Sequence, residues 1–135
     1  MDHVQLLRPA ALAGTAPYAY AAAVGDLVFT AGACPLDLEG RVVSPGDVAG
    51  QATRVMDNLE TALAAGGCGL TDVVKSTVYV ASADRADLVA AWEVVRARFG
   101  DHDAPSTLLG VAVLGYPEQL VEVEAIAVRP TRAEG

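Results

Sequence analysis

Apolar residues recur along the chain with two different spacings, which separate helices from strands. Between residues 47 and 65 they return every three or four positions, as one face of an amphipathic helix requires. Residues 84–100 repeat this spacing. Asp47 and Asp84 stand where helix N-caps are expected, and glycines follow both segments as stop signals. The pattern therefore predicts two helices.

Runs rich in β-branched residues predict the strands, and turn residues bound them. The expected strands are residues 24–31, 73–80, 106–114 and 120–128, with a short hairpin inside residues 35–45. In residues 73–80, strict alternation places Val74 on the apolar side and Lys75 on the opposite side. The order of elements predicts an α/β (α+β) fold, in which a mixed sheet carries both helices on one face. The uncovered face is expected to be buried in a closed symmetric oligomer.

Length and charge narrow the class of protein. A chain of 135 residues fits a single domain, residues 1–135, with a loose tail from about residue 130. The net charge of −8 argues against nucleic acid as a partner. No apolar run is long enough to cross a bilayer, and the first residues do not resemble a signal peptide, so we expect a cytoplasmic protein without a membrane partner. Cys34 and Cys68 are expected to be free thiols, and no metal or cofactor is expected.

Several separated segments match one known family in order along the chain. They are Pro17-Tyr18, residues 29–35 (FTAGACP), the Asp-Asn-Leu step that ends at Leu59, residues 72–80 (DVVKSTVYV) and residues 121–128 (VEVEAIAV). Together these segments resemble the Rid (reactive intermediate deaminase, YjgF-like) family. The resemblance implies a chorismate-mutase-like fold and a homotrimer, whose sheets form a central barrel with three clefts between subunits.

The resemblance also implies a chemistry and a set of site residues. Rid deaminases bind a small 2-imino or enamino acid in the cleft and release a 2-oxo acid and ammonia. An arginine holds the carboxylate of the ligand, a glutamate helps to activate water, and a tyrosine packs over the ligand. By this resemblance Glu124 matches the glutamate and Tyr18 the tyrosine. The remaining substrate-binding positions that it implies are Ala31, Gly32, Cys34, Ser106 and Thr107.

Ser106 is the main departure from the family pattern. The family's arginine lies in a Pro-Ala-Arg-Ser/Thr segment, and the matching residues 104–107 read APST here. No other Lys or Arg occurs between Arg98 and Arg129, so a local shift of the match restores no cation. Losing the guanidinium costs a bound carboxylate about 2–4 kcal/mol. Deamination of ordinary 2-imino acids is therefore in doubt.

Three of the candidate residues carry two interpretations each. Cys34 is either a small buried apolar residue or a thiol that faces the cleft. Tyr18 is either a lid over the ligand or an ordinary packing aromatic. Glu124 alternates with apolar neighbours on its strand, so it faces a cleft or solvent. Glu122 shares that side of the strand, which allows a pair of carboxylates.

Two functional hypotheses follow. The first is a Rid enzyme without the arginine, which uses Glu124 as acid or base on a neutral or differently anchored imine, enamine or related metabolite. The second is a non-catalytic trimeric module that binds a metabolite. Ribonuclease activity is a third interpretation, and the acidic balance, the few aromatics and the lack of a basic patch argue against it.

Overall fold

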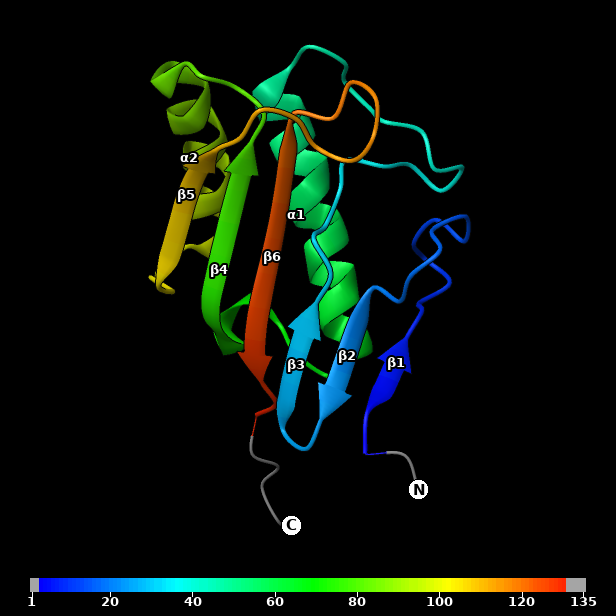
Figure 1. Cartoon of the computed structure of the whole chain (residues 1–135). Coiled ribbons are helices and arrows are strands. Elements are labelled where there is room, and N and C mark those ends of the chain that lie inside the picture. The colour runs from blue at the N-terminus through cyan, green and yellow to red at the C-terminus, as the bar shows by residue number, and fades with distance from the viewer. Residues whose placement is uncertain (1–2, 131–135) are drawn as a thin grey trace.

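Six strands form one mixed sheet in the computed structural model, which describes residues 3–130. The strands are β1 (Gln5–Leu7), β2 (Ala21–Val24), β3 (Leu27–Thr30), β4 (Val73–Val80), β5 (Ser106–Gly110) and β6 (Val121–Val128). Their order across the sheet is β1-β2-β3-β6-β4-β5 (Figure 1). Only the β4–β5 pair is parallel among these strands, and the other pairs are antiparallel. The expected mixed sheet is confirmed.

Both expected helices are present and start at the predicted caps. Helix α1 spans Val48–Ala65, and the Asp47 carboxylate accepts a hydrogen bond of 2.9 Å from the backbone N–H of Gly50. Helix α2 spans Arg85–Phe99, and Asp84 caps it in the same way. It ends at Gly100, whose φ of +64° is a left-handed conformation that glycine adopts without strain. A single 3-10 turn, η1 (Leu70–Asp72), leads into β4.

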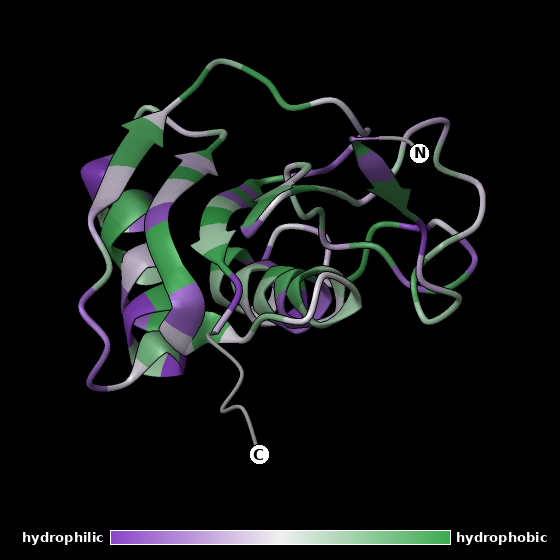
Figure 2. Ribbon diagram, turned by 90° about the horizontal axis from the view of Figure 1, so that it is seen from below, coloured by the Kyte–Doolittle hydropathy of each residue, from purple (hydrophilic) through white to green (hydrophobic). Residues whose placement is uncertain are grey.

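The two helices lie on the same face of the sheet and bury the hydrophobic core between the two layers. Figure 2, viewed along the strands, shows this arrangement of one sheet layer and one helix layer. Helix α1 packs against β2, β3 and β6, whereas α2 packs against β4 and β5. Most of the largest fully buried apolar side chains come from α1 and from the inward positions of β4 and β6, and they include Met56, Leu59, Leu63, Val78 and Val123. Burial of these side chains is the main stabilising contribution to the fold.

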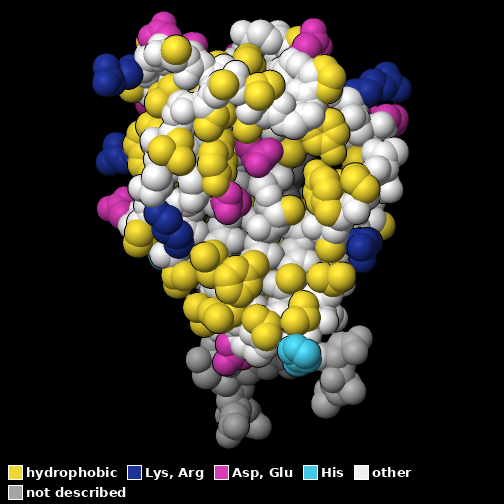
Figure 3. All heavy atoms as spheres, in the orientation of Figure 1, with side chains coloured by type: hydrophobic (Ala, Val, Ile, Leu, Met, Phe, Trp, Pro, Cys, Tyr) yellow, Lys and Arg dark blue, Asp and Glu magenta, His cyan; other side chains and the backbone are white. Residues whose placement is uncertain are grey.

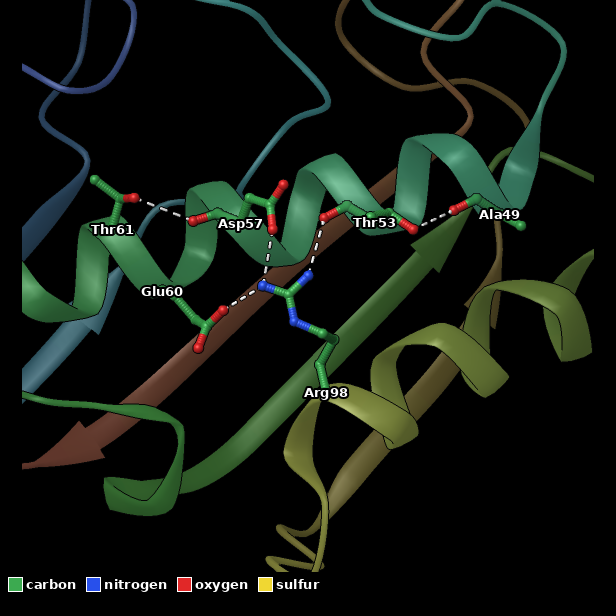
Figure 4. A network of polar contacts seen from close by, with 6 residues as sticks. All are labelled: Ala49, Thr53, Asp57, Glu60, Thr61 and Arg98. Carbon is green, nitrogen blue, oxygen red and sulfur yellow. Dashed lines mark hydrogen bonds and ion pairs between the residues drawn. The ribbon is translucent and has the colours of Figure 1, made fainter.

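Arg98 joins the two helices at the surface (Figure 4). Its guanidinium, on the last turn of α2, forms ion pairs with Asp57 and Glu60 on α1. It also donates a longer hydrogen bond of 3.4 Å to the carbonyl oxygen of Thr53. Since all three charged side chains are partly exposed, this contact contributes orientation more than stability.

Several parts of the chain differ from the sequence-based expectation. The strand expected over residues 106–114 ends at Gly110. Residues 24–31 are not one strand, because Gly25 and Asp26 form the turn between β2 and β3. The hairpin in residues 35–45 is reduced to a single bridge between Leu36 and Val42. In β4, the pairing with β6 shifts between Val73 and Lys75, so Val73 is buried and Val74 is exposed.

No helix within residues 3–130 covers the other face of the sheet, and much of this face is apolar (Figure 3). Its exposed apolar residues lie on five strands and are Leu6, Val24, Leu27, Phe29, Leu109 and Val128. Acidic side chains lie near its middle (Figure 3), and β6 contributes Glu122 and Glu124 to this face. We call this surface the open face.

Two further expectations concern a membrane-spanning helix and the C-terminal tail. Among residues 3–130, no helix combines the length and the apolar character needed to span a bilayer. The loose tail was expected from about residue 130, and residues 131–135 lie outside the described part of the chain.

Candidate functional site

The candidate site forms where the segment after β3 meets the start of β6. Ala33 and Val123 exchange backbone hydrogen bonds, at 2.7 and 3.2 Å, and both side chains point into the core. Side chains alternate along paired strands, so the residues next to them turn toward the open face. This pairing places Gly32 and Cys34 beside Glu122.

These residues line an open hollow of about 290 Å³ at one end of the sheet. Its lining residues are Tyr18, Ala31, Gly32, Cys34, Gly115, Tyr116 and Glu122. The hydroxyl groups of Tyr18 and Tyr116 are hydrogen-bonded to each other at 3.2 Å, although the residues are far apart in the sequence. Tyr20 packs edge-on against Tyr18, at 5.8 Å between ring centroids, and supports it from outside the hollow. Aromatic rings thus form one wall and a carboxylate stands near them.

Glu122 is held at one of its two carboxylate oxygens. Oε1 accepts a hydrogen bond from Gln119 Nε2 at 3.1 Å and lies 3.4 Å from the Sγ of Cys34. Among the described residues, no group donates to Oε2, and this atom remains accessible to solvent. It lies over Gly32, where an added Cβ would approach it to 2.2 Å. Oε2 is therefore the oxygen that is available to a ligand or a water molecule.

Cys34 is a protonated hydrogen-bond donor in this site. Its thiol is buried, which is the main reason why its pKa rises to about 12, and the negative charge of Glu122 raises it further. At neutral pH the thiol therefore retains its proton and is a poor nucleophile. Asn58 fixes this segment from below, because its amide donates to the carbonyl oxygens of Cys34 and Leu36 at 2.8 and 3.0 Å. Both Cys34 and Cys68 are free cysteines, as expected.

Burial also keeps Tyr18 protonated. Desolvation is the largest cause of its raised pKa, followed by the hydrogen bond with Tyr116. Each hydroxyl has a single hydrogen, so the Tyr18–Tyr116 contact uses one and leaves the other available to a ligand. The hollow thus offers a neutral hydroxyl donor, a thiol and a carboxylate.

The other residues expected at the site lie elsewhere on the sheet within one chain. Glu124 follows Glu122 on β6 and accepts a hydrogen bond of 2.5 Å from the hydroxyl of Tyr79. Thr107 on β5 accepts a hydrogen bond of 2.5 Å from Lys75 Nζ. The structure therefore brings Tyr18, Ala31, Gly32 and Cys34 together with Glu122, and does not bring Glu124 or Thr107 to them.

Ser106 lies on the helix side of the sheet. Its hydroxyl contacts that of the buried Ser76 and donates to the carbonyl oxygen of Ala104 at 3.1 Å. Strand β4 separates β5 from β6, so Ser106 is not part of the hollow in its own chain.

The charge of the hollow comes from one residue. Among its lining residues, all of which lie in the described part of the chain, Glu122 is the single one with a formal charge. Residues 3–130 contain no group of three His, Cys, Asp or Glu side chains placed to hold a metal ion. A carboxylate without a neighbouring cation attracts cations and repels anions.

Sequence reasoning did not single out Tyr116 or Gln119. Tyr116 lies in the segment of residues 115–118, whose glycine and proline indicate a turn. This signal gives no indication that the Tyr116 ring lines the hollow. Gln119 is buried beneath this loop, and no motif marks it. Glu122 had a signal, because it alternates in step with Glu124 on the same strand.

Replacing Gly32 with alanine is expected to weaken the binding of a small ligand in the hollow by about tenfold or more, because the carboxylate of Glu122 must move aside. The melting temperature should change little, since the obstructed group is the flexible end of a side chain. Ligand titration and thermal unfolding measure the two effects. Gly69→Ala is the matched control, because no atom lies within 4 Å of a Cβ added there. Equal affinity in both variants would contradict the placement of Glu122 over Gly32.

Comparison with known proteins shows which family shares this architecture. The model of the family described as Endoribonuclease L-PSP matches residues 8–129. A RutC family protein of Pyrococcus abyssi is 38% identical over 112 residues, which cover 82% of this chain and 85% of that protein. The 2-iminobutanoate/2-iminopropanoate deaminase of Escherichia coli K12 is 34% identical over 119 residues, which cover 87% of this chain and 91% of the deaminase.

Solved structures agree with this relationship. The YjgF gene product of E. coli superposes with a TM-score of 0.80 at 30% identity, over 93% of this chain and 99% of its own. E. coli TdcF, crystallised with bound serine, gives the same TM-score, identity and coverage. These matches extend over nearly the whole chain and include every element that builds the hollow.

Proposed function

The chain belongs to the Endoribonuclease L-PSP family, the Rid or YjgF-like family that its motifs indicate, and on this basis we propose that it hydrolyses small imines. The products are a carbonyl compound and ammonia. The observation that carries the proposal is the carboxylate of Glu122, whose Oε2 is accessible beside two tyrosine hydroxyls. Glu122, rather than Glu124, is the proposed acid and base.

The chemistry needs one proton to be removed and returned. Glu122 Oε2 takes a proton from water while the water oxygen bonds to the carbon of a protonated imine, and the C=N electron pair moves to nitrogen. The nitrogen of the resulting carbinolamine then takes the proton back from Glu122. The C–N bond breaks with its electrons on the departing ammonia, which takes up the hydroxyl proton as the carbonyl forms and leaves as ammonium. The free hydroxyl hydrogen of the tyrosine pair is placed to orient the ligand.

The charge of the site indicates the ligand class. The proposed substrate is neutral or positively charged at the imine and carries no carboxylate, because the hollow offers it no Lys or Arg. TdcF of E. coli, by contrast, was crystallised with serine, a ligand that bears a carboxylate. A phosphate backbone is disfavoured for the same electrostatic reason, which argues against RNA cleavage in this hollow.

We also propose that three copies associate through the open face. This face combines exposed apolar residues on several strands with a polar centre. Single exposed apolar residues are normal on a monomer, whereas a patch that extends over several strands indicates an interface. In a trimer the hollow would lie near a subunit boundary, where a neighbouring copy completes its open side.

A substrate screen tests the proposed function. Imines generated in solution by an amine oxidase, which lack a carboxylate, are expected to be hydrolysed at least about tenfold faster than 2-imino acids generated by an amino-acid oxidase, because only the latter place an anion beside Glu122. Release of ammonia above the spontaneous rate is the measurement.

Three results would change the proposal. A preference for 2-imino acids would overturn the assigned ligand class. Hydrolysis of neither class would overturn the reaction. In that case, a metabolite that raises the melting temperature without being consumed would identify the protein as a binding module.

A further inference from the structure

We infer that Gln119 is a positioning residue, which holds Oε1 of Glu122 and the Tyr116 wall of the hollow in one fixed arrangement. This inference rests on the function proposed for Glu122. Gln119 is only 4% exposed, and its side-chain amide makes three hydrogen bonds. No step of the proposed reaction uses it directly.

The surroundings of Gln119 fix which way its amide points. The backbone N–H of Tyr116 is a donor and requires an oxygen, and it lies 3.1 Å from Oε1. The carbonyl oxygen of Val121 is an acceptor and requires an N–H, and it lies 3.1 Å from Nε2. Reversing the amide would place two donors and two acceptors face to face. Nε2 therefore faces Glu122 by necessity and donates to its Oε1.

This arrangement gives the two carboxylate oxygens of Glu122 different roles: one is held by hydrogen bonds and the other is accessible. Gln119 and Cys34 both donate to Oε1, so its lone pairs are engaged. Oε2 stays accessible and is directed over Gly32 into the hollow. A carboxylate held in this way presents the same oxygen to each water molecule, which favours proton transfer.

Gln119 also fixes the aromatic wall. By accepting from the backbone N–H of Tyr116, it sets the position of the residue whose hydroxyl meets that of Tyr18. One buried amide thus connects the acid–base group with the wall that faces it. The loss of this side chain should disturb both at once.

A second buried glutamine provides a matched control. Gln51 is fully buried, and it holds the same loop by donating to the carbonyl oxygen of Glu118 at 3.0 Å and accepting from the N–H of Leu120 at 2.7 Å. It makes no hydrogen bond with Glu122. If the loop needs only support, Gln51→Met and Gln119→Met should have similar effects.

The first test measures the thiol of Cys34 and needs no substrate. In a Cys68→Ser background, Gln119→Met is expected to speed the alkylation of Cys34 by iodoacetamide about tenfold at pH 8. The released carboxylate of Glu122 moves away from the thiol, so neither its charge nor its hydrogen bond raises the pKa of Cys34 any longer. Loss of the Gln119 side chain removes a hydrogen bond that lowers this pKa, but each contribution of Glu122 is larger, so the net change is downward. A pKa lower by one unit gives about ten times more thiolate. Gln51→Met should alkylate at the rate of the parent protein.

The second test measures kinetics on an imine that the parent protein hydrolyses. Gln119→Met is expected to lower kcat about tenfold or more and to change KM less than about threefold, because the group that transfers the proton is misplaced. Gln51→Met should stay within about twofold of the parent in both. Gln119→Asn is the second variant, since its shorter amide cannot reach both Tyr116 and Glu122.

The two tests separate this inference from the proposed function. Equal alkylation rates in Gln119→Met, Gln119→Asn and Gln51→Met, all with unchanged thermal unfolding, would overturn the role of Gln119. If the parent protein hydrolyses no imine, the proposed function fails, and the alkylation rates still decide whether Gln119 positions Glu122.

Discussion

Glu122→Gln is expected to lower kcat for imine hydrolysis by about 100-fold or more, within the usual range for loss of a general acid or base. The amide has nearly the same shape as the carboxylate, so it still fits between Gln119 and Gly32. It cannot take a proton from water at Oε2, however. The rate of ammonia release at saturating imine measures the effect.

Glu124→Gln is the matched control for this change. It alters the same residue type on the same face of β6, two positions along, where the carboxylate accepts from Tyr79 and does not line the hollow. Its kcat is expected to stay within about threefold of the parent protein, since the amide oxygen of glutamine can still accept from the Tyr79 hydroxyl and only the charge is lost. A large loss in Glu124→Gln with none in Glu122→Gln would return the acid–base role to Glu124.

Phe29→Asp is expected to convert the proposed trimer to monomers. Phe29 is 40% exposed on the open face of β3, opposite Ile126 of β6, and the proposed trimer buries it. Each subunit would then have to bury an unpaired carboxylate, which costs several kcal/mol per site. Light scattering at micromolar concentration should show the mass of one chain, 13.8 kDa, for the variant and the mass of three chains for the parent protein.

A control separates the open face from surface charge in general. Val89 is 50% exposed on α2, in the helix layer behind the sheet, so Val89→Asp adds the same charge on the other side of the molecule. This variant should keep the mass of the parent protein. If Phe29→Asp keeps it as well, or if the parent protein is itself monomeric, the open face is not the subunit interface.

The helices and the long strands of this protein could be predicted because local chemistry determines them. Asp47 and Asp84 cap their helices as expected, since a carboxylate beside free backbone N–H groups is favoured in nearly any surroundings. Alternation in β6 correctly placed Glu122 and Glu124 on one face. The family was predictable as well, because its motifs are spread along the whole chain.

The short elements were not predictable, because their partners stabilise them. Strand β1 has only three residues, and β2 is largely alanine, which has little preference for strands. Strand β2 therefore depends on its pairing with β3, and β1 depends on its pairing with β2. The strict period of two also failed at Val74, where the shifted pairing with β6 turns the side chain outward. No local signal marks that shift.

The sequence by itself determined that this is a Rid-family chain with two carboxylates on one face of its last strand. Ser106 stands where the resemblance places the family's arginine. Only the tertiary structure decided which carboxylate faces Tyr18 and Cys34. Alternation treats Glu122 and Glu124 alike, whereas the pairing of Ala33 with Val123 and the bond from Gln119 select Glu122. The pairing of Ala33 with Val123 joins segments 90 residues apart, and the energy of such a contact depends on register and burial rather than on local sequence. Gln119 is close to Glu122 in the sequence, but its amide is oriented by the loop and strand around it.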